Sequence, residues 1–140
     1  TNKVRLLGLD LGSKRIGISI SDGNQSIATP HKTLNKTTSS KLIEELRLII
    51  NENSIKGLII GNPINMDGTL GKSSHSVNSI ASNIEKSLDI PVCLWDERLS
   101  TVAAFKLSSQ LDTNISKRVK NIDENAATFI LQGAIDYLNN

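Results

Sequence analysis

The fold is decided by residues 4–22, which read VRLLGLDLGSKRIGISISD. Residues 6–11 form an apolar run typical of a buried strand, and residues 15–21 alternate isoleucine with small or polar residues, which is the period of a strand. The three-residue link between them predicts a β-hairpin. Asp10 interrupts the first strand, and burying a carboxylate without a partner costs on the order of several kcal/mol. We therefore expect Asp10 to meet a metal ion, a cation or a set of hydrogen bonds.

The rest of the chain predicts a mixed sheet flanked by helices. A third strand around Ile27–Leu34 contains Pro30, which places it at an edge of the sheet. Strands then alternate with helices, so three antiparallel strands are followed by parallel ones in a five-stranded α/β domain over residues 1–140. The later elements expected are a helix capped by Ser39 or Ser40, a strand over 57–61, a helix over 77–88, a strand over 91–95, a helix from Ser100 and a last helix over 126–138.

Composition excludes several classes of protein. The 140 residues suit one domain with a full core, and 38% apolar with 21% charged residues is ordinary for a globular chain. No apolar run is long enough to span a membrane and no signal peptide opens the chain, so a cytoplasmic protein without membrane contact is expected. The single cysteine, Cys93, lies in an apolar run, which predicts a buried and inert thiol.

Two further acids stand at unusual places, and each has an ordinary interpretation beside a functional one. Glu97 follows a short apolar strand, where an acid can compensate the dipole of the next helix. Asp123 can cap the last helix, but it also aligns with the apolar stripe of that helix. Asp10 itself can accept hydrogen bonds from turn amides. Taken together, the three carboxylates suit hard oxygen ligands of Mg²⁺ or Mn²⁺, which would support phosphodiester hydrolysis.

Basic residues lie close in sequence to these acids. Between residues 103 and 122 there are four cations and one anion, although the whole chain has a net charge of only +2. A solvated helix end and a phosphate-binding rim explain this cluster about equally well. If a rim exists, its members are predicted to be Lys14, Arg15, Arg98, Lys117, Arg118 and Lys120. The Gly- and Asn-rich loop over 62–72 is expected to move and to close over nucleic acid.

Four motifs, in order, resemble the YqgF family of Holliday junction resolvase-like proteins, over nearly the whole chain. They are GLDLGSKRIG at residues 8–17, IGNP at 60–63 with DGT at 67–69, WDERLST at 95–101, and IDENAA at 122–127 leading into ILQ at 130–132. The chain departs from the family pattern at Ser100, where threonine is usual, and at residues 133–135, where bulkier residues are usual. The fourth strand also ends without the acid that related resolvases carry, so Glu97 would supply the second carboxylate.

The resemblance implies a ribonuclease H-like fold and metal-binding or catalytic roles for Asp10, Glu97 and Asp123. It further implies a bacterial cytoplasmic setting and processing of the 5′ end of pre-16S ribosomal RNA, with ribosomal precursor particles as partners. A Holliday junction resolvase acting on branched DNA, and a weakly active RNA-binding protein of ribosome assembly, remain as alternatives. Phosphate binding as in actin-like ATPases is disfavoured by the short chain. The sequence leaves a monomer or a homodimer open.

Overall fold

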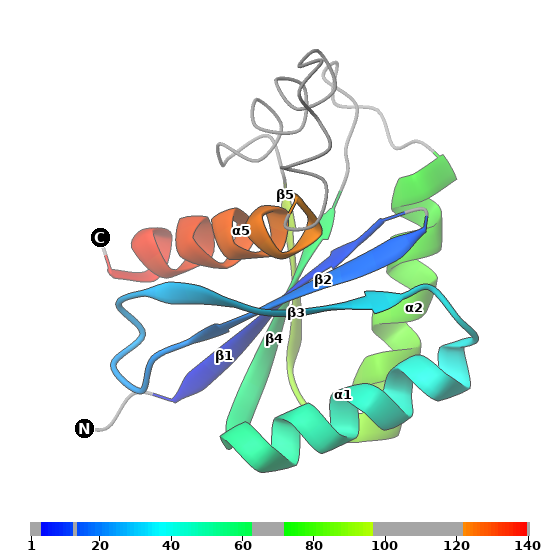
Figure 1. Cartoon of the computed structure of the whole chain (residues 1–140), viewed down its shortest axis with the longest axis horizontal. Coiled ribbons are helices and arrows are strands. Elements are labelled where there is room, and N and C mark those ends of the chain that lie inside the picture. The colour runs from blue at the N-terminus through cyan, green and yellow to red at the C-terminus, as the bar shows by residue number, and fades with distance from the viewer. Residues whose placement is uncertain (1–3, 13, 63–71, 97–121, 140) are drawn as a thin grey trace.

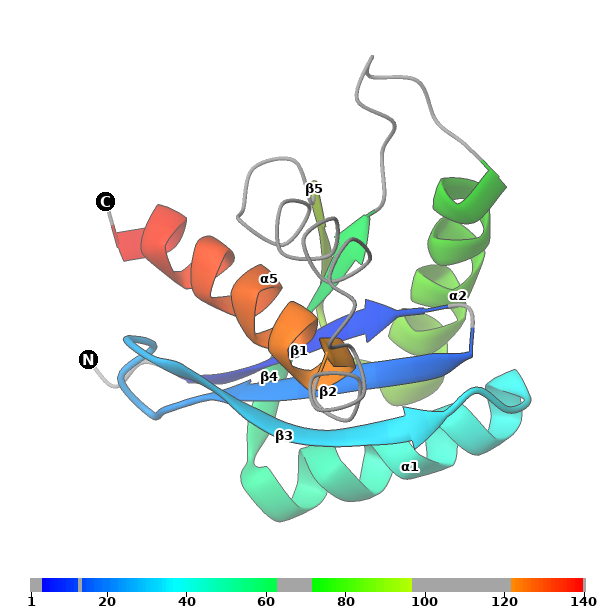
Figure 2. The ribbon, with the colours of Figure 1, turned by 45° about the horizontal axis from the view of Figure 1, so that its top comes forward.

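The computed structural model describes residues 4–12, 14–62, 72–96 and 122–139, with the backbone alone for 72–75 and 122–125. The described part is a five-stranded sheet with helices on both faces (Figures 1 and 2). Its elements are β1 (Arg5–Leu11), β2 (Arg15–Ser21), β3 (Ala28–Asn35), α1 (Ser39–Asn53), β4 (Ile55–Asn62), α2 (Lys72–Leu88), β5 (Val92–Asp96) and α5 (Ile122–Asn139). The helix expected from Ser100 lies outside the described residues.

The strand order is β3-β2-β1-β4-β5. β1, β2 and β3 pair antiparallel, whereas β4 pairs parallel to both β1 and β5, so the predicted mixed sheet is confirmed. β3 is one of the two outer strands, as Pro30 predicted. Because β1, β4 and β5 are parallel, their carboxyl ends meet at one edge of the sheet, and the link from β1 to β2 lies at the same edge.

Alternation along β1 creates two separate apolar cores. Leu7 and Leu9 point into the core between the sheet and helices α1 and α2, while Leu6 points into the core under α5. Figure 2 shows α5 on the face of the sheet opposite to α1. The sheet is therefore covered on both sides, which explains why β1 is apolar on both faces.

One predicted cap is wrong by a single residue. Thr38, not Ser39 or Ser40, caps α1, and its hydroxyl accepts a hydrogen bond from the Lys41 amide at 3.3 Å. The threonine side chain is the one placed three residues before that amide, the spacing an N-cap uses. Among the described residues, no helix is both long enough and apolar enough to cross a membrane.

Candidate active site

Asp10 lies buried at the carboxyl end of β1, with only 2% of its surface exposed. It shares the α5 face of the sheet with Leu6 and Gly8, because alternate residues of a strand point to the same face. Its partner on β2 is Gly17. On β4, the pairing of Leu9 with Ile60 makes the next residue, Gly61, its neighbour. Asp10 is thus flanked on both adjacent strands by residues without side chains.

The other two strand ends at this edge carry Asn62 and Asp96, which are register partners. Asn62 lies two residues after Ile60, and Asp96 lies two residues after Leu94. Ile60 and Leu94 both contact the core under α1 and α2. Asn62 and Asp96 therefore belong to the face opposite to Asp10. Trp95, between Leu94 and Asp96, belongs to the α5 face, where it contacts the second core.

The first turn of α5 contains Asp123 and is directed toward the Asp10 end of β1. The direction follows from two sets of contacts. Gly8 lies against Ala127 and Leu131, in the first ten residues of the helix, whereas Leu6 lines a groove with residues of its last turns. Moving along β1 toward Asp10 therefore means moving toward the start of α5.

The convergence of three acids remains a prediction. Several predicted site residues lie outside the described residues: Glu97, Arg98, Lys117, Arg118 and Lys120. The same holds for residues 63–71 of the predicted loop, and the side chain of Asp123 is not described. Within the parts of the chain that the structure describes, no three His, Cys, Asp or Glu side chains gather at one point. The donor chemistry of Asp10 does fit a hard divalent cation, because it is a carboxylate whose neighbours on both adjacent strands carry no side chain.

A basic residue that the sequence pattern did not single out joins Lys14 and Arg15. The amide of Lys36 donates a hydrogen bond to the carbonyl oxygen of Lys14 at 2.9 Å, and Arg15 pairs with Asn35. Lys14, Arg15 and Lys36 are all exposed, and they lie at the edge of the sheet where β1 ends. The signal for Lys36 was available only through strand pairing, since the antiparallel pairing of β2 with β3 brings the end of β3 beside the start of β2.

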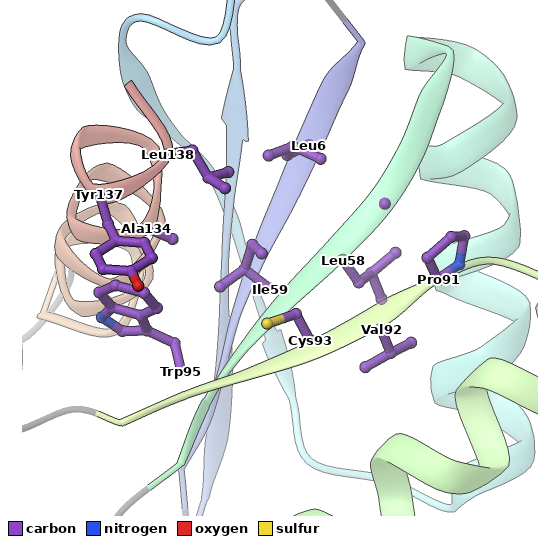
Figure 3. Close-up of a pocket in the computed structure, with 11 residues that line it drawn as sticks. Leu6, Leu58, Ile59, Pro91, Val92, Cys93, Trp95, Ala134, Tyr137 and Leu138 are labelled. Atoms are coloured by element: carbon purple, nitrogen blue, oxygen red, sulfur yellow. The ribbon is translucent and has the colours of Figure 1, made fainter. Parts of the chain in front are cut away.

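Cys93 corrects the expectation of a buried thiol, because its side chain is exposed. α5 contacts β1, β2 and β3 far more than it contacts β4, so the α5 face of β5 is not closed by the helix. An apolar groove of about 310 Å³ runs there between β4, β5 and the last turns of α5 (Figure 3). Trp95 and Tyr137 meet edge to face along it, with ring centroids 5.6 Å apart, and Cys93 lines it.

The strand order and the helices on both faces define an α/β protein with the ribonuclease H-like fold. Several solved structures share this fold. The RuvC protein of T. thermophilus in complex with Holliday junction substrate matches with a TM-score of 0.59 at 8% identity, over 97% of this chain and 96% of that chain. The Fowlpox virus resolvase in complex with Holliday junction DNA gives a TM-score of 0.56 at 8% identity, over 97% and 99%. At such identities the likeness establishes the fold alone.

Sequence similarity gives the family. The RuvX family model, described as Holliday junction resolvase, matches residues 4–137. A protein of Pelagibacter ubique (strain HTCC1062) named "Putative pre-16S rRNA nuclease" is 71% identical over 140 residues, covering 100% of this chain and 93% of the relative. A relative of the same name from Paramagnetospirillum magneticum (strain ATCC 700264 / AMB-1) is 42% identical over 132 residues, covering 94% and 85%. The chain belongs to the RuvX family and is a nuclease, which confirms the resemblance to YqgF proteins.

Proposed function

We propose that this nuclease is a divalent-metal-dependent endonuclease that cleaves the 5′ region of pre-16S ribosomal RNA in the bacterial cytoplasm. The observation that carries the proposal is Asp10, a buried carboxylate at the carboxyl edge of the sheet with glycine on both neighbouring strands. A strand that buries an acid between two residues without side chains suits a site that receives a cation and a phosphate group. The names of two close relatives support RNA as the substrate.

Asp10, Glu97 and Asp123 would hold Mg²⁺ or Mn²⁺. When bound, such ions activate water and stabilise the charge that develops on the phosphate oxygens. Glu97 directly follows Asp96, which shares the α1 and α2 face, so continued alternation of β5 would give Glu97 the face of Asp10. Asp123 would approach from the first turn of α5. In the hydrolysis, water adds to phosphorus, the bond from phosphorus to one ester oxygen breaks, and that oxygen leaves with a proton.

The basic residues at this edge would hold the nucleic-acid backbone. Lys14, Arg15 and Lys36 form one group of exposed cations on adjacent strands. Lysine and arginine contacts to phosphates fix the register of a nucleic acid without reading its sequence. The remaining members of the proposed rim are Arg98, Lys117, Arg118 and Lys120.

A second candidate function is resolution of four-way DNA junctions, because the matching family model is described as Holliday junction resolvase. A third is RNA binding during ribosome assembly with little cleavage. The two alternatives differ from the proposal in substrate and in chemistry, respectively, so one set of assays separates all three.

The test is cleavage of pre-16S RNA and of a four-way junction by the purified protein, with and without Mg²⁺. Asp10→Asn keeps the shape of the side chain and removes its charge. We expect cleavage to fall by about two orders of magnitude or more, since metal-assisted charge stabilisation supplies several kcal/mol. Asp89→Asn is the matched control: Asp89 is exposed, precedes β5 at the opposite edge of the sheet, and has a φ of 50° that asparagine tolerates.

Three outcomes would contradict parts of the proposal. Equal cleavage by Asp10→Asn and Asp89→Asn would remove Asp10 from the chemistry. Cleavage of the junction but not of the RNA would favour the resolvase. Normal 5′ ends on the small-subunit RNA of cells that carry only Asp10→Asn would favour a binding protein.

A further inference from the structure

Ser19 makes a hydrogen bond that crosses from the sheet to α5. Its hydroxyl donates to the carbonyl oxygen of Ala127 at 2.8 Å, and the serine is fully buried. Helix carbonyls normally accept only from the amide four residues later, so this bond is an additional attachment of the helix backbone to β2. Ala127 lies one helical turn after Asp123.

Gly8, the register partner of Ser19, lets the helix come this close. A Cβ atom at Gly8 would lie 2.7 Å from the Cβ of Leu131 and 3.0 Å from the carbonyl oxygen of Ala127, and it would also overlap the hydroxyl of Ser19. The backbone of α5 therefore rests directly on the β1–β2 pair at this point. Gly8 is two residues before Asp10 on the same face of β1.

The opposite half of α5 has its own attachment. The side chain of Gln132 accepts a hydrogen bond from the Ala28 amide at 2.8 Å and donates to the Ser26 carbonyl at 3.0 Å. Asn139 donates to the carbonyl of Gln25 at 2.8 Å. The second half of α5 is thus fixed to the β2–β3 connection, whereas the bond from Ser19 to Ala127 attaches the first half of the helix to the sheet.

From this arrangement we infer that Ser19 is a positioning residue, which sets the distance between the first turn of α5 and the end of β1 and so holds Asp123 beside Asp10. The inference rests on the proposed metal site. Ser19 does not itself touch metal or RNA; it acts through the Ala127 carbonyl. Groups that orient metal ligands typically contribute about 10- to 100-fold to metal affinity or activity.

The test compares Ser19→Ala with Gln132→Ala, which removes an attachment in the second half of the same helix. Mn²⁺ affinity is measured by paramagnetic resonance on the full chain, well below the unfolding temperature of each variant. We expect Ser19→Ala to weaken Mn²⁺ binding about 10-fold and to lower kcat with little change in KM for RNA. Gln132→Ala should lose stability but keep the Mn²⁺ affinity and kcat of the parent protein.

Hydrogen exchange of the metal-free protein gives a second readout that does not involve activity. Ser19→Ala should speed exchange in the first turns of α5, and Gln132→Ala in the last turns. If Ser19→Ala does not fold, Ser19→Cys takes its place, since a thiol is a weaker donor of similar shape; it should show the same changes to a smaller extent.

The outcomes separate this inference from the proposed function. If the parent protein binds Mn²⁺, Asp10→Asn abolishes binding and Ser19→Ala binds like the parent, the metal site stands and the positioning role of Ser19 is overturned. Equal losses in Ser19→Ala and Gln132→Ala would overturn it as well, because they would reflect helix docking in general. Absence of Mn²⁺ binding in the parent protein would overturn both.

Discussion

Replacing Gly8 with alanine tests the close approach of α5 to the sheet. The added Cβ would meet the Cβ of Leu131 at 2.7 Å and the carbonyl oxygen of Ala127 at 3.0 Å, and real Cβ contacts essentially never fall below 3.0 Å. Two of these neighbours are helix atoms close to the backbone, so the whole helix must shift rather than a flexible side chain. We therefore expect a clear loss of stability together with displacement of the start of α5.

Three terms determine how much free energy of unfolding Gly8→Ala loses. Overpacking of a core costs about 1–3 kcal/mol. A shifted helix also loses the bond from Ser19 to Ala127, which is worth about 1 kcal/mol. Replacing glycine with alanine returns about 0.4–1 kcal/mol by restricting the unfolded chain. The net loss is about 1–3.6 kcal/mol, which for a chain of this length lowers Tm by roughly 3–14 °C.

The assay is urea unfolding followed by circular dichroism, with Gly23→Ala as the matched control. Nothing lies within 4 Å of a Cβ built at Gly23, so that variant should be as stable as the parent or slightly more stable. The double variant Gly8→Ala with Ser19→Ala lacks the hydroxyl that the new Cβ would overlap. Its loss in free energy of unfolding should therefore be about 1 kcal/mol smaller than the sum of the losses in the two single variants. A Gly8→Ala protein as stable as Gly23→Ala would refute the close packing of α5.

Three further measurements test separate features. Neutralising Lys14 and Lys36 together should weaken RNA binding and lower the slope of log K against log salt by up to about 1.4–1.8, the value for two phosphate contacts. Neutralising Lys56, which is exposed on β4 near the amino end of that strand, should leave the slope unchanged. An unchanged slope in the Lys14 and Lys36 variant would show that this pair is an ordinary solvated surface. The Ser26 and Ile27 amides donate hydrogen bonds to the Asp22 carboxylate and hold its pKa below the ordinary value of 3.8. The stabilisation of the folded protein by ionised Asp22 is therefore complete above pH 3.8 and is lost as pH falls through the lower folded pKa. The Tm difference between the parent and Asp22→Asn should follow that course, and a difference that stays constant down to about pH 2 would contradict it. The exposed Cys93 thiol should react with a chromogenic disulfide in the native protein at nearly the rate seen in urea, and strong protection would indicate a covered groove.

The sequence predicted what depends on local periodicity. Alternation in β1 gave the correct face for Asp10, and Pro30 gave the correct edge, because both follow from the geometry of one strand. The prediction that Cys93 is buried was wrong, because the exposure of this side chain depends on how far α5 extends across the sheet. No pattern in the sequence of β5 indicates that distance. The sequence did not predict roles for Lys36 and Ser19 for the same reason. Strand pairing brings Lys36 to Lys14, and packing of α5 on the sheet brings Ser19 to Ala127.

Glycines at three positions around Asp10 show how one face of the sheet is divided. Glycine weakens a strand by roughly 0.5–1 kcal/mol relative to alanine, so Gly8, Gly17 and Gly61 together are a considerable cost to a sheet. At Gly8 the space is filled, since the backbone of α5 occupies it. Gly17 and Gly61 lie on either side of Asp10, one step nearer the carboxyl edge, where the helix is only beginning. The proposed site gives these two glycines a role: the helix closes the face as far as Gly8, and residues without side chains on both sides of Asp10 would admit the metal and the phosphate.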